Sequence, residues 1–370
     1  MQIRTYCSIL FILATCSCIF AEAWQQITPN GTDNPPQLQG HSMVVINNQI
    51  YLYGGIDPDG NQQNNIYIFD QGLNQWIKRT PQAASGTFRP RHGHVCLVYN
   101  GEMWIFYGYN EDEGELDEIW VYTPSTNTCR KIDDPTTRPS ARMDHRMVVL
   151  DTSAYLVGGR NYNGTFAEGQ LWEYDFADNE WTSSIGIDQR YNHQMAVVDE
   201  KIYVFSGQGT SGLLNDFRVY DPETKGWSTI TPTNPINSRS GAAVVADSDG
   251  IWIMGGYVND RADQSDEHWF YDVDTQTWEE KEAGFVVEQA QAVVVTNSQA
   301  TFQYYLFGGL DDDGTLLDEL WKYDAASDDG DDDDDDDDGD DDDDGSNHLS
   351  CGATGIEILL LVLCLCWRKL

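Results

Sequence analysis

The chain has 370 residues, 40% of them apolar, so it can bury a large core. Its formal net charge is −40, and 15 aspartates fill residues 328–344 apart from two glycines, which leaves about −25 for the rest. A body this acidic excludes nucleic-acid binding through a general basic patch.

Residues 1–23 are predicted to be a secretory signal peptide. Arg4 lies in the polar start, an apolar run follows over residues 7–20, and residues 21–23 form an A-x-A-type cleavage site. The run is short for a membrane span, which disfavours the alternative of a signal anchor. We therefore expect export.

Only Cys96 and Cys129 of the 8 cysteines lie in the body, so the exported part is not a disulfide scaffold. They fall in the first and fourth predicted strands of one sheet, roughly 14 Å apart at about 4.8 Å a strand. This separation exceeds the roughly 7 Å Cα limit for a disulfide, and we expect both thiols to be unpaired.

A short motif, an aromatic or apolar run that ends in two small residues, occurs six times. The first residue of the small pair is placed at positions 54, 108, 158, 206, 255 and 308. A period of about 50 residues indicates one structural unit copied six times. We call the copies units one to six.

Each unit carries about four segments of strand character. In unit two they cover residues 94–99, 102–107, 118–122 and 129–132. Alternating β-branched and aromatic residues between turn-forming clusters favour strands, and no helical period competes. The fold class is therefore predicted to be all-β.

The third segment of each unit ends in an aromatic residue followed by an acid, with Tyr122-Thr123 as the variant. Six residues after the acid or threonine a tryptophan recurs, with Cys129 replacing it in unit two. A fixed spacing indicates the same hairpin each time. The tryptophans are Trp76, Trp181, Trp227 and Trp278.

The sixth unit lacks this last strand, because the residue six positions after Asp324 is Gly330, inside the acidic run. Residues 24–27 resemble residues 227–230 and have no preceding strands of their own. We expect the N-terminal segment to complete the sixth sheet and close a ring, which hides the sheet edges.

The glycine pair, the aromatic-acid pair, the trailing tryptophan and a recurring Arg-x-x-His resemble the kelch repeat over about residues 24–326. The resemblance implies a six-bladed β-propeller of four-stranded antiparallel sheets around a central channel. The glycines would lie near the axis, where a Cβ would collide with neighbours. Unit two departs from the pattern at Tyr109 and Cys129, and unit four at Ser206.

The first strand of each unit starts with a repeated position pair. The six pairs are Leu38 and His41, Arg91 and His94, Arg142 and His145, Arg190 and His193, Arg239 and Ala242, and Gln289 and Ala292. In the kelch family residues at this strand start commonly help to form the ligand-binding mouth. Guanidinium suits bidentate carboxylate recognition, so we predict an anion-tolerant mouth lined by the four arginines, with His94, His145 and His193.

Two alternatives remain open for these residues. Each arginine can pair with acids of adjacent blades, and the histidines can be structural groups between strand and turn. A ring at the mouth is too wide for metal ligands at about 2 Å, so we expect no metal site there. Acidic loops at residues 57–60, 111–113, 260–267 and 311–314 lack EF-hand spacing and are typical of solvated turns.

No catalytic set can be named. The cysteines do not offer a galactose-oxidase-like copper site. Acid-base chemistry of the kelch mutarotase type would need an acid and a base that face each other across the channel, and spacing along the chain does not show which residues do so. We expect no cofactor beyond weak Ca²⁺ association with the aspartate run. Asn30 and Asn163 lie in glycosylation sequons.

Residues 327–350 are predicted to be a disordered acidic linker and residues 351–370 a hydrophobic anchor. The apolar run of ten residues at 358–367 is short for a span, so a GPI-type signal and a short transmembrane tail both stay open.

We thus expect a monomeric kelch propeller on the cell surface, or secreted, that binds a protein or glycan at the channel mouth. The alternatives are a mutarotase-type sugar enzyme and a divalent-cation-binding surface protein acting through its aspartates.

Overall fold

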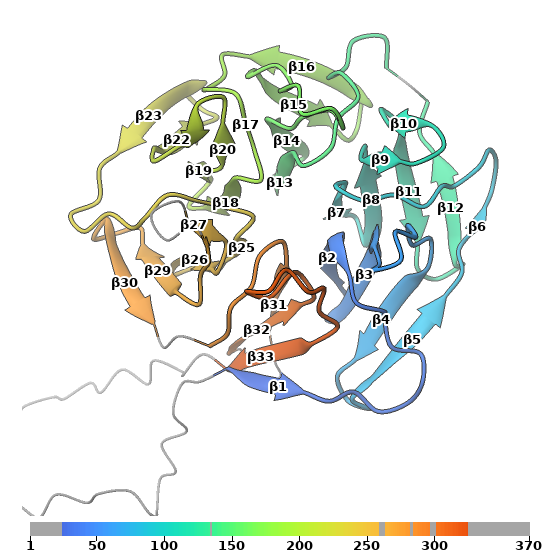
Figure 1. The fold of residues 1–370 in the computed structure, drawn as a ribbon. Coiled ribbons are helices and arrows are strands. Elements are labelled where there is room, and N and C mark those ends of the chain that lie inside the picture. The colour runs from blue at the N-terminus through green and yellow to red at the C-terminus, as the bar shows by residue number, and fades with distance from the viewer. Residues whose placement is uncertain (1–23, 134, 259–262, 282–283, 297–300, 325–370) are drawn as a thin grey trace, which may run out of the picture. The chain divides into compact units, whose positions relative to one another are not determined.

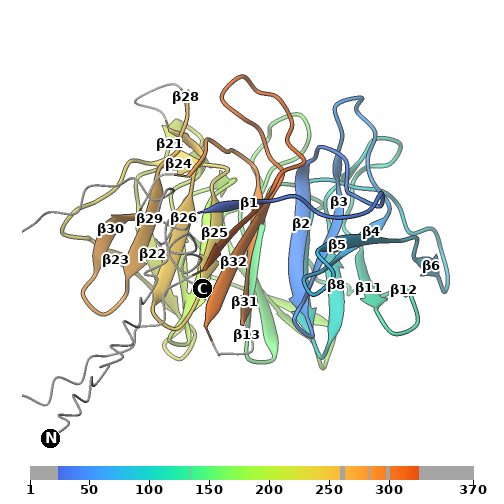
Figure 2. The same ribbon diagram turned by 90° about the horizontal axis from the view of Figure 1, so that it is seen from below.

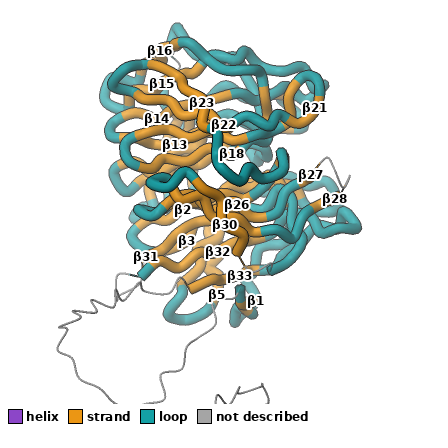
Figure 3. Tube along the Cα trace, turned by 90° about the vertical axis from the view of Figure 1, so that its left-hand side faces the viewer, coloured by secondary structure: helices purple, strands orange, loops and turns teal. Residues whose placement is uncertain are grey.

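The computed structural model describes residues 24–324 except 134, 259–262, 282–283 and 297–300. All regular elements in these residues are strands, as the colouring in Figure 3 shows. The all-β prediction is therefore confirmed. The predicted signal peptide, aspartate linker and C-terminal anchor lie outside the described residues.

Six large sheets follow the six units, and within each unit consecutive strands pair antiparallel. Units one to three contribute β2 (Gln39–Ile46), β3 (Gln49–Ile56), β4 (Ile66–Asp70) and β5 (Gln75–Arg79), then β7 (Val95–Tyr99), β8 (Glu102–Phe106), β11 (Ile119–Thr123) and β12 (Thr128–Lys131), then β13 (Arg146–Leu150), β14 (Ser153–Val157), β15 (Leu171–Asp175) and β16 (Glu180–Ser184). Units four to six contribute β18 (Gln194–Val198), β19 (Lys201–Phe205), β22 (Phe217–Asp221) and β23 (Gly226–Ile230), then β25 (Ala243–Ala246), β26 (Gly250–Met254), β29 (His268–Asp272) and β30 (Thr277–Lys281), then β31 (Gln291–Thr296), β32 (Phe302–Phe307) and β33 (Leu320–Asp324).

Short strands extend or accompany these sheets. They are β6 (Gln82–Ala83), which pairs parallel with β12, and β9 (Tyr109–Asn110), β10 (Gly114–Glu115), β17 (Arg190–Tyr191), β20 (Gln208–Gly209), β21 (Gly212–Leu213), β24 (Arg239–Ser240), β27 (Tyr257–Val258) and β28 (Asp263–Gln264). The strands β9, β10, β20, β21, β27 and β28 lie in the loops that follow the small-residue pairs, and β17 and β24 lie just before first strands and pair with β20 and β27 in small sheets. We call this side of the sheets the loop end.

The sixth sheet is completed by the N-terminal strand β1 (Gln25–Ile27), which pairs antiparallel with β33. Gln25 lies opposite Lys322, and the ring of Trp24 lies 5.5 Å from that of Tyr323. Trp24 thus takes the place that the trailing tryptophan has in other units, as predicted.

The first strands of the six units are neighbours in chain order, and β31 also neighbours β2. Figure 1 shows these strands nearest the centre and the fourth strands farthest out, and Figure 2 shows the same sheets from the side. The most central position of each sheet is therefore its first strand.

The core lies between sheets of successive units. One cluster joins unit one to unit two through Tyr53 and Trp120, and another joins unit six to unit one through Phe307 and Trp76. Four further clusters connect the remaining neighbours in order. Burial of apolar surface at about 25 cal/mol per Å² therefore stabilises each sheet through its neighbours as well as through itself.

The predicted hairpins form with the expected register. In unit four Tyr220 lies directly opposite Trp227, and the Asp221 carboxylate accepts hydrogen bonds from the backbone amides of Glu223 and Thr224. Lys225 closes the turn in the left-handed region, at φ 53°. The same cross-strand pairing recurs in units one, three and five, and Tyr122 pairs with the buried Cys129 in unit two. The acid therefore caps a turn.

One of the predicted small pairs was placed one residue too late. In unit two the pair is Tyr107 and Gly108, because Gly108 has the φ of 99° that the second glycine has in the other units, where it lies between 92° and 105°. Tyr107 and Ser206 occupy the first position with φ of 59° and 56°. The departure of unit two is thus at Tyr107 rather than Tyr109. In unit three, a Cβ on Gly158 would lie 2.2 Å from the Arg190 carbonyl oxygen, which explains the preference for glycine.

Candidate functional site at the loop end

A ladder of backbone hydrogen bonds links the units at the loop end. One residue per unit has a left-handed backbone, with φ between 50° and 67°. From unit two onward, the amide of this residue donates to the carbonyl of its counterpart in the preceding unit at 2.7–3.1 Å. The six residues are Gly40, Gly93, Asp144, Asn192, Gly241 and Gln289. We call this chain the left-handed ladder.

The ladder corrects the alignment of unit six. The residue two positions before Gln289 is Val287, and its carbonyl accepts the amide of Gly256, as the Arg91 carbonyl accepts that of Gly55. Val287 and Ala290 are therefore the counterparts of the arginine and histidine, in place of Gln289 and Ala292.

The four arginines of the predicted mouth are completely buried. In unit five, Arg239 Nη1 donates to the Gly255 carbonyl at 2.9 Å, Nη2 to Glu267 Oε2 at 3.0 Å and Nε to the Asn237 carbonyl at 3.3 Å. Arg91, Arg142 and Arg190 make the same three kinds of contact, with Glu118, Glu168 and Asp216 as acids. Each guanidinium thus joins the first small residue of its own unit to the acid just before the third strand.

In unit four the acid of this pair, Asp216, has a lowered pKa. Burial raises the pKa of Asp216, but hydrogen bonds from Arg190 and Arg218 outweigh burial and leave its pKa below the ordinary value. The geometry assigns the arginines a structural role within one unit, whereas the alternative weighed from sequence placed the acids on adjacent blades. Direct ligand contact stays a prediction, and the described structure leaves no guanidinium surface for it.

The histidines of the repeat are also buried. His94 packs edge-on against Tyr53 of the preceding unit at 5.1 Å between ring centroids, and His145 packs on Tyr107. Both ring nitrogens of His94, His145 and His193 lack a hydrogen-bond partner in the described structure. Burial lowers the pKa of His41 to about 3 and those of the other three well below the ordinary value. They are neutral packing groups between sheets.

Partly buried side chains at the loop end directly follow the buried arginines. His92 comes directly after Arg91, and its Nδ1 lies 2.8 Å from Gln62 Nε2 of unit one. Its ring packs on Tyr109, which stacks on Tyr162 of unit three at 4.4 Å with an interplanar angle of 14°. Tyr162 is 62% exposed, so one face of the stack is open to solvent.

A charged group adjoins this stack. Arg160 Nη2 pairs with Asp144 Oδ2 at 2.8 Å, and its guanidinium lies 4.8 Å from the centre of the Tyr191 ring. Burial lowers the pKa of His92, while Asp144 raises it and Arg160 lowers it, so the two charges lie close to that imidazole. We call His92, Tyr109, Asp144, Arg160, Tyr162 and Tyr191 the mouth cluster.

Two carboxylates, those of Glu111 and Glu115, lie close to the tyrosine stack. The Glu115 carboxylate accepts the Tyr162 amide at 2.6 Å, and Glu111 and Glu115 add their charges to burial in raising the pKa of Tyr109. Glu111, Asp112 and Glu113 are exposed. The mouth is therefore aromatic and acidic, although arginines were predicted to line it.

The acidic loops are turns. In unit one the Asp57 carboxylate accepts the amides of Asp59 and Asn61, and Asp311 accepts those of Asp313 and Thr315 in unit six. No group of three or more metal-ligating side chains occurs in the part of the chain that the structure describes. The loop predicted at residues 260–267 lies partly outside the described residues.

Asn163 is exposed at the tip of an equivalent turn, and its Oδ1 accepts the Thr165 hydroxyl at 2.7 Å. Asn30 is exposed, and its Nδ2 donates to the Leu73 carbonyl at 3.2 Å. Both predicted glycosylation sites thus lie at the surface. Cys96 and Cys129 are buried and free, as predicted.

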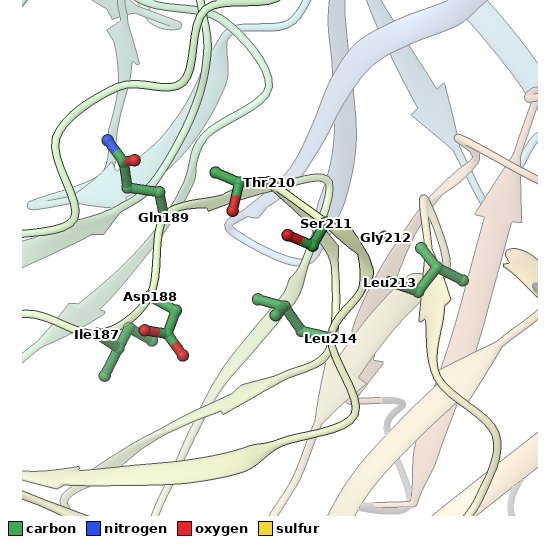
Figure 4. A pocket seen from close by; sticks show the side chains of 8 residues that line it. All are labelled: Ile187, Asp188, Gln189, Thr210, Ser211, Gly212, Leu213 and Leu214. Atoms are coloured by element: carbon green, nitrogen blue, oxygen red, sulfur yellow. The ribbon is translucent and has the colours of Figure 1, made fainter.

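A hollow of about 470 Å³ lies between residues 187–189 and 210–214 (Figure 4). Asp188 is its one charged residue, and its carbonyl is held by Arg190 Nε. This hollow offers no converging set of chemical groups. Over the described stretches, helices of the length and apolarity needed for a membrane span are absent.

Sequence reasoning missed the mouth cluster, although its signal was present. Two of its members, His92 and Tyr191, directly follow the arginines, and two others, Tyr109 and Arg160, directly follow the small pairs. Backbone bridges join His92 to Tyr109 and Met143 to Arg160, so these two positions meet in every unit at the loop end.

Known proteins share this repeat. The leucine-zipper-like transcriptional regulator 1 homolog of Drosophila melanogaster is 25% identical over 272 residues, covering 67% of this chain and 27% of that protein. Kelch domain-containing protein 3 of Bos taurus is 24% identical over 247 residues, covering 60% of this chain and 64% of that protein. The chain thus matches less than two thirds of the length of these relatives.

A family model described as the KLHDC2/KLHL20/DRC7 Kelch-repeats domain matches residues 5–188 and 183–285. The matched residues include the described parts of units one to four and most of unit five. They cover well over half of the chain, and the chain therefore belongs to this kelch-repeat family.

Proposed function

We propose that the chain is a closed six-bladed propeller whose loop end binds a basic segment of a protein partner. Six blades and their closure are inferred from the neighbouring of β31 and β2, the left-handed ladder and the completion of the last sheet by β1. A closed ring leaves its outward loops as the natural place for variable binding groups.

The observation that carries the binding proposal is the stack of the half-buried Tyr109 on the exposed Tyr162. Tyrosines with one polar end are favoured at protein interfaces, because they bury large apolar area and keep a hydrogen-bonding group. Here two units contribute one ring each, so the stack exists only in the assembled fold.

The charge around the stack selects the partner. Glu111 and Glu115 act on Tyr109 through their charges, and a lysine or arginine over a tyrosine face gains a cation-π interaction of about 0.5–2 kcal/mol. The body also carries an excess of negative charge, which accelerates encounter with a basic partner. An anionic protein or glycan ligand, which the buried arginines suggested, fits this surface less well.

Location is part of the proposal. The signal peptide at residues 1–23 and the apolar segment at 351–370 support a propeller exported and tethered to a membrane, with the aspartate run as its spacer. The aspartates are polyanionic and would bind divalent cations weakly. No described group of side chains favours an enzyme of the mutarotase type.

The test measures binding of lysine-rich and glutamate-rich peptides of equal length, and of uronic-acid sugars, to the purified chain. We expect the lysine-rich peptide to bind, with at least tenfold weaker affinity for Tyr109→Ala and Tyr162→Ala. The matched control is Tyr99→Ala, since Tyr99 stacks on Phe176 at 4.1 Å away from the loop end. Every variant keeps the aspartate run, so a difference between variants reports the loop end.

Two results would contradict the proposal. Equal peptide affinity of all three variants would remove the tyrosine stack as the site. Binding of only the glutamate-rich peptide would support an anionic protein ligand instead, and binding of only the uronic sugars would support a glycan ligand.

A further inference from the structure

A cavity of about 140 Å³ lies at the centre of the ring of first strands. Its lining comes from the first strand of each unit or the residue just before it. A cavity of this size is much smaller than a drug-sized pocket, and an apolar cavity of about 150 Å³ holds a benzene-sized molecule. The cavity therefore fits a ligand of a few heavy atoms.

One cation lies in this cavity. Arg146 begins β13, two positions after the ladder residue Asp144, and its counterparts in the other units carry no charge. These counterparts are Ser42, Val95, Gln194, Ala243 and Gln291. Unit three alone places a charge at this level of the channel.

Arg146 has no acid of its own. Among the described residues no carboxylate lies within 4.0 Å of its guanidinium, and its one hydrogen bond, to the His145 carbonyl, is 3.5 Å long. Asp144 acts on Arg146 through its charge, but that carboxylate is already paired with Arg160. Two guanidinium groups thus share one carboxylate, and a net positive charge remains.

The other titratable groups near Arg146 do not supply the missing charge. His145 and His193 are kept neutral by burial, and the charge of Arg146 lowers their pKa further. Cys96 lines the cavity as a thiol, because burial raises its pKa to about 12. Arg146 is half-buried, and burial lowers the pKa of its guanidinium. A partly desolvated charge without a partner is costly, so a bound anion would be favoured.

The rest of the lining defines the anion. Besides Arg146, the cavity has polar groups at Ser42, His94 and Gln291. The Ser42 oxygen accepts the Cys96 amide at 2.9 Å, and the hydroxyl also contacts the Cys96 thiol. The remaining lining is largely apolar and rich in methionine. These side chains are Met43, Val95, Met147, Met195, Ala242, Ala243 and Val244.

We propose that the central cavity binds a short-chain monocarboxylate, with its carboxylate on the Arg146 guanidinium and its alkyl chain among the methionines. A guanidinium matches a carboxylate in bidentate geometry, and thioethers adapt to small apolar groups. This site lies below the loop end, has the opposite charge and is independent of the proposed binding of a basic segment.

The experiment follows thermal unfolding and calorimetric binding of the full chain with sodium butyrate, butyramide and sodium sulfate at matched ionic strength. Butyrate should raise Tm in a saturable way, butyramide should not, and sulfate should be at least tenfold weaker. Arg146→Met should have a higher Tm without ligand, because it removes a half-buried cation that has no carboxylate within 4.0 Å, and should lose the butyrate response. Lys201→Met removes one exposed positive charge and should keep it.

The proposal is overturned if butyrate gives no saturable response, if Arg146→Met responds as the unmodified chain does, or if butyramide acts equally. An equal sulfate response would refute the monocarboxylate assignment. Tyr162→Ala should keep butyrate binding, and Arg146→Met should keep peptide binding, so failure of one site is distinguished from failure of the other.

Discussion

Units two to five and units one and six build the same strand start with different side chains. Arg91 in unit two is clamped to Glu118, whereas unit one has Leu38 and Asn65 at these places. The backbone contact is retained in both, since the Leu38 carbonyl accepts the Gly309 amide just as the Arg91 carbonyl accepts that of Gly55. The fold therefore needs the backbone contact, and the arginine is needed only where an acid is buried beside it.

The largest expected effect comes from breaking one pair. Arg91→Leu leaves the Glu118 carboxylate buried with only Lys131 at 3.6 Å, and we expect the free energy of unfolding to fall by about 3–5 kcal/mol. Arg91→Leu with Glu118→Asn copies unit one and should recover most of the loss. Urea unfolding measures both, and a loss below about 1 kcal/mol in the single variant would show that the pair is dispensable.

The next effect concerns the N-terminal strand. Trp24→Ala removes a half-buried ring that packs on Tyr323, Phe285 and His268, and should cost about 2–3 kcal/mol. Trp76→Ala in unit one, where the indole is 3% exposed, should cost more. If Trp24→Ala unfolds at the urea concentration of the unmodified chain, the N-terminal strand does not hold the last sheet.

Units with a buried histidine should lose stability as pH falls, whereas units with alanine at this position should not. The pKa of folded His41 is about 3, against about 6.5 when unfolded, so between these values only the unfolded chain takes up the proton. Stability is therefore full above pH 6.5 and falls as pH decreases, by about 2 kcal/mol for His41 at pH 5.

His41→Ala, which copies units five and six, should flatten the dependence of Tm on pH between 7.5 and 5. An unchanged slope would mean that His41 titrates alike in both states. This range lies above the region where Asp216 and Glu168, whose pKa values are lowered, begin to lose their ionised form.

The smallest effect is chemical. Burial raises the pKa of Cys96 and Cys129 to about 12, so both should resist alkylation at pH 8 in the folded chain. After denaturation without reductant each should gain one alkyl group by mass spectrometry. A denatured body that gains no mass would reveal a disulfide.

Much of the fold could be predicted from the sequence, because each unit repeats its strand period and turn residues. The fixed count from Asp221 to Trp227 gave the hairpin register, and Trp24 could be assigned to the last sheet from its likeness to Trp227. The small pair of unit two was misplaced by one residue, since Tyr107 adopts a left-handed backbone that tyrosine rarely takes.

The arginine site was less predictable, although one signal was available. In units two to five an acid follows each arginine after 26 to 28 residues, and in unit one, which has Leu38, the corresponding residue is Asn65. Unit six, with Val287 and Glu319, does not follow this pattern. This covariation between copies indicates internal pairing. The stack of Tyr109 and Tyr162 depends on which loops face each other, and spacing along one chain carries no such information.

The pairing of β1 with β33 also sets the order of assembly during synthesis. The backbone of Gln25 can pair only after Lys322, about 300 residues later, has been synthesised. The ring can close only after nearly the whole body has left the ribosome, and until then Trp24 and the edge of the last sheet stay open to solvent or to a chaperone. A chain truncated before residue 320 would lack β33, so β1 would have no strand to pair with, and its exposed backbone would favour association with other chains.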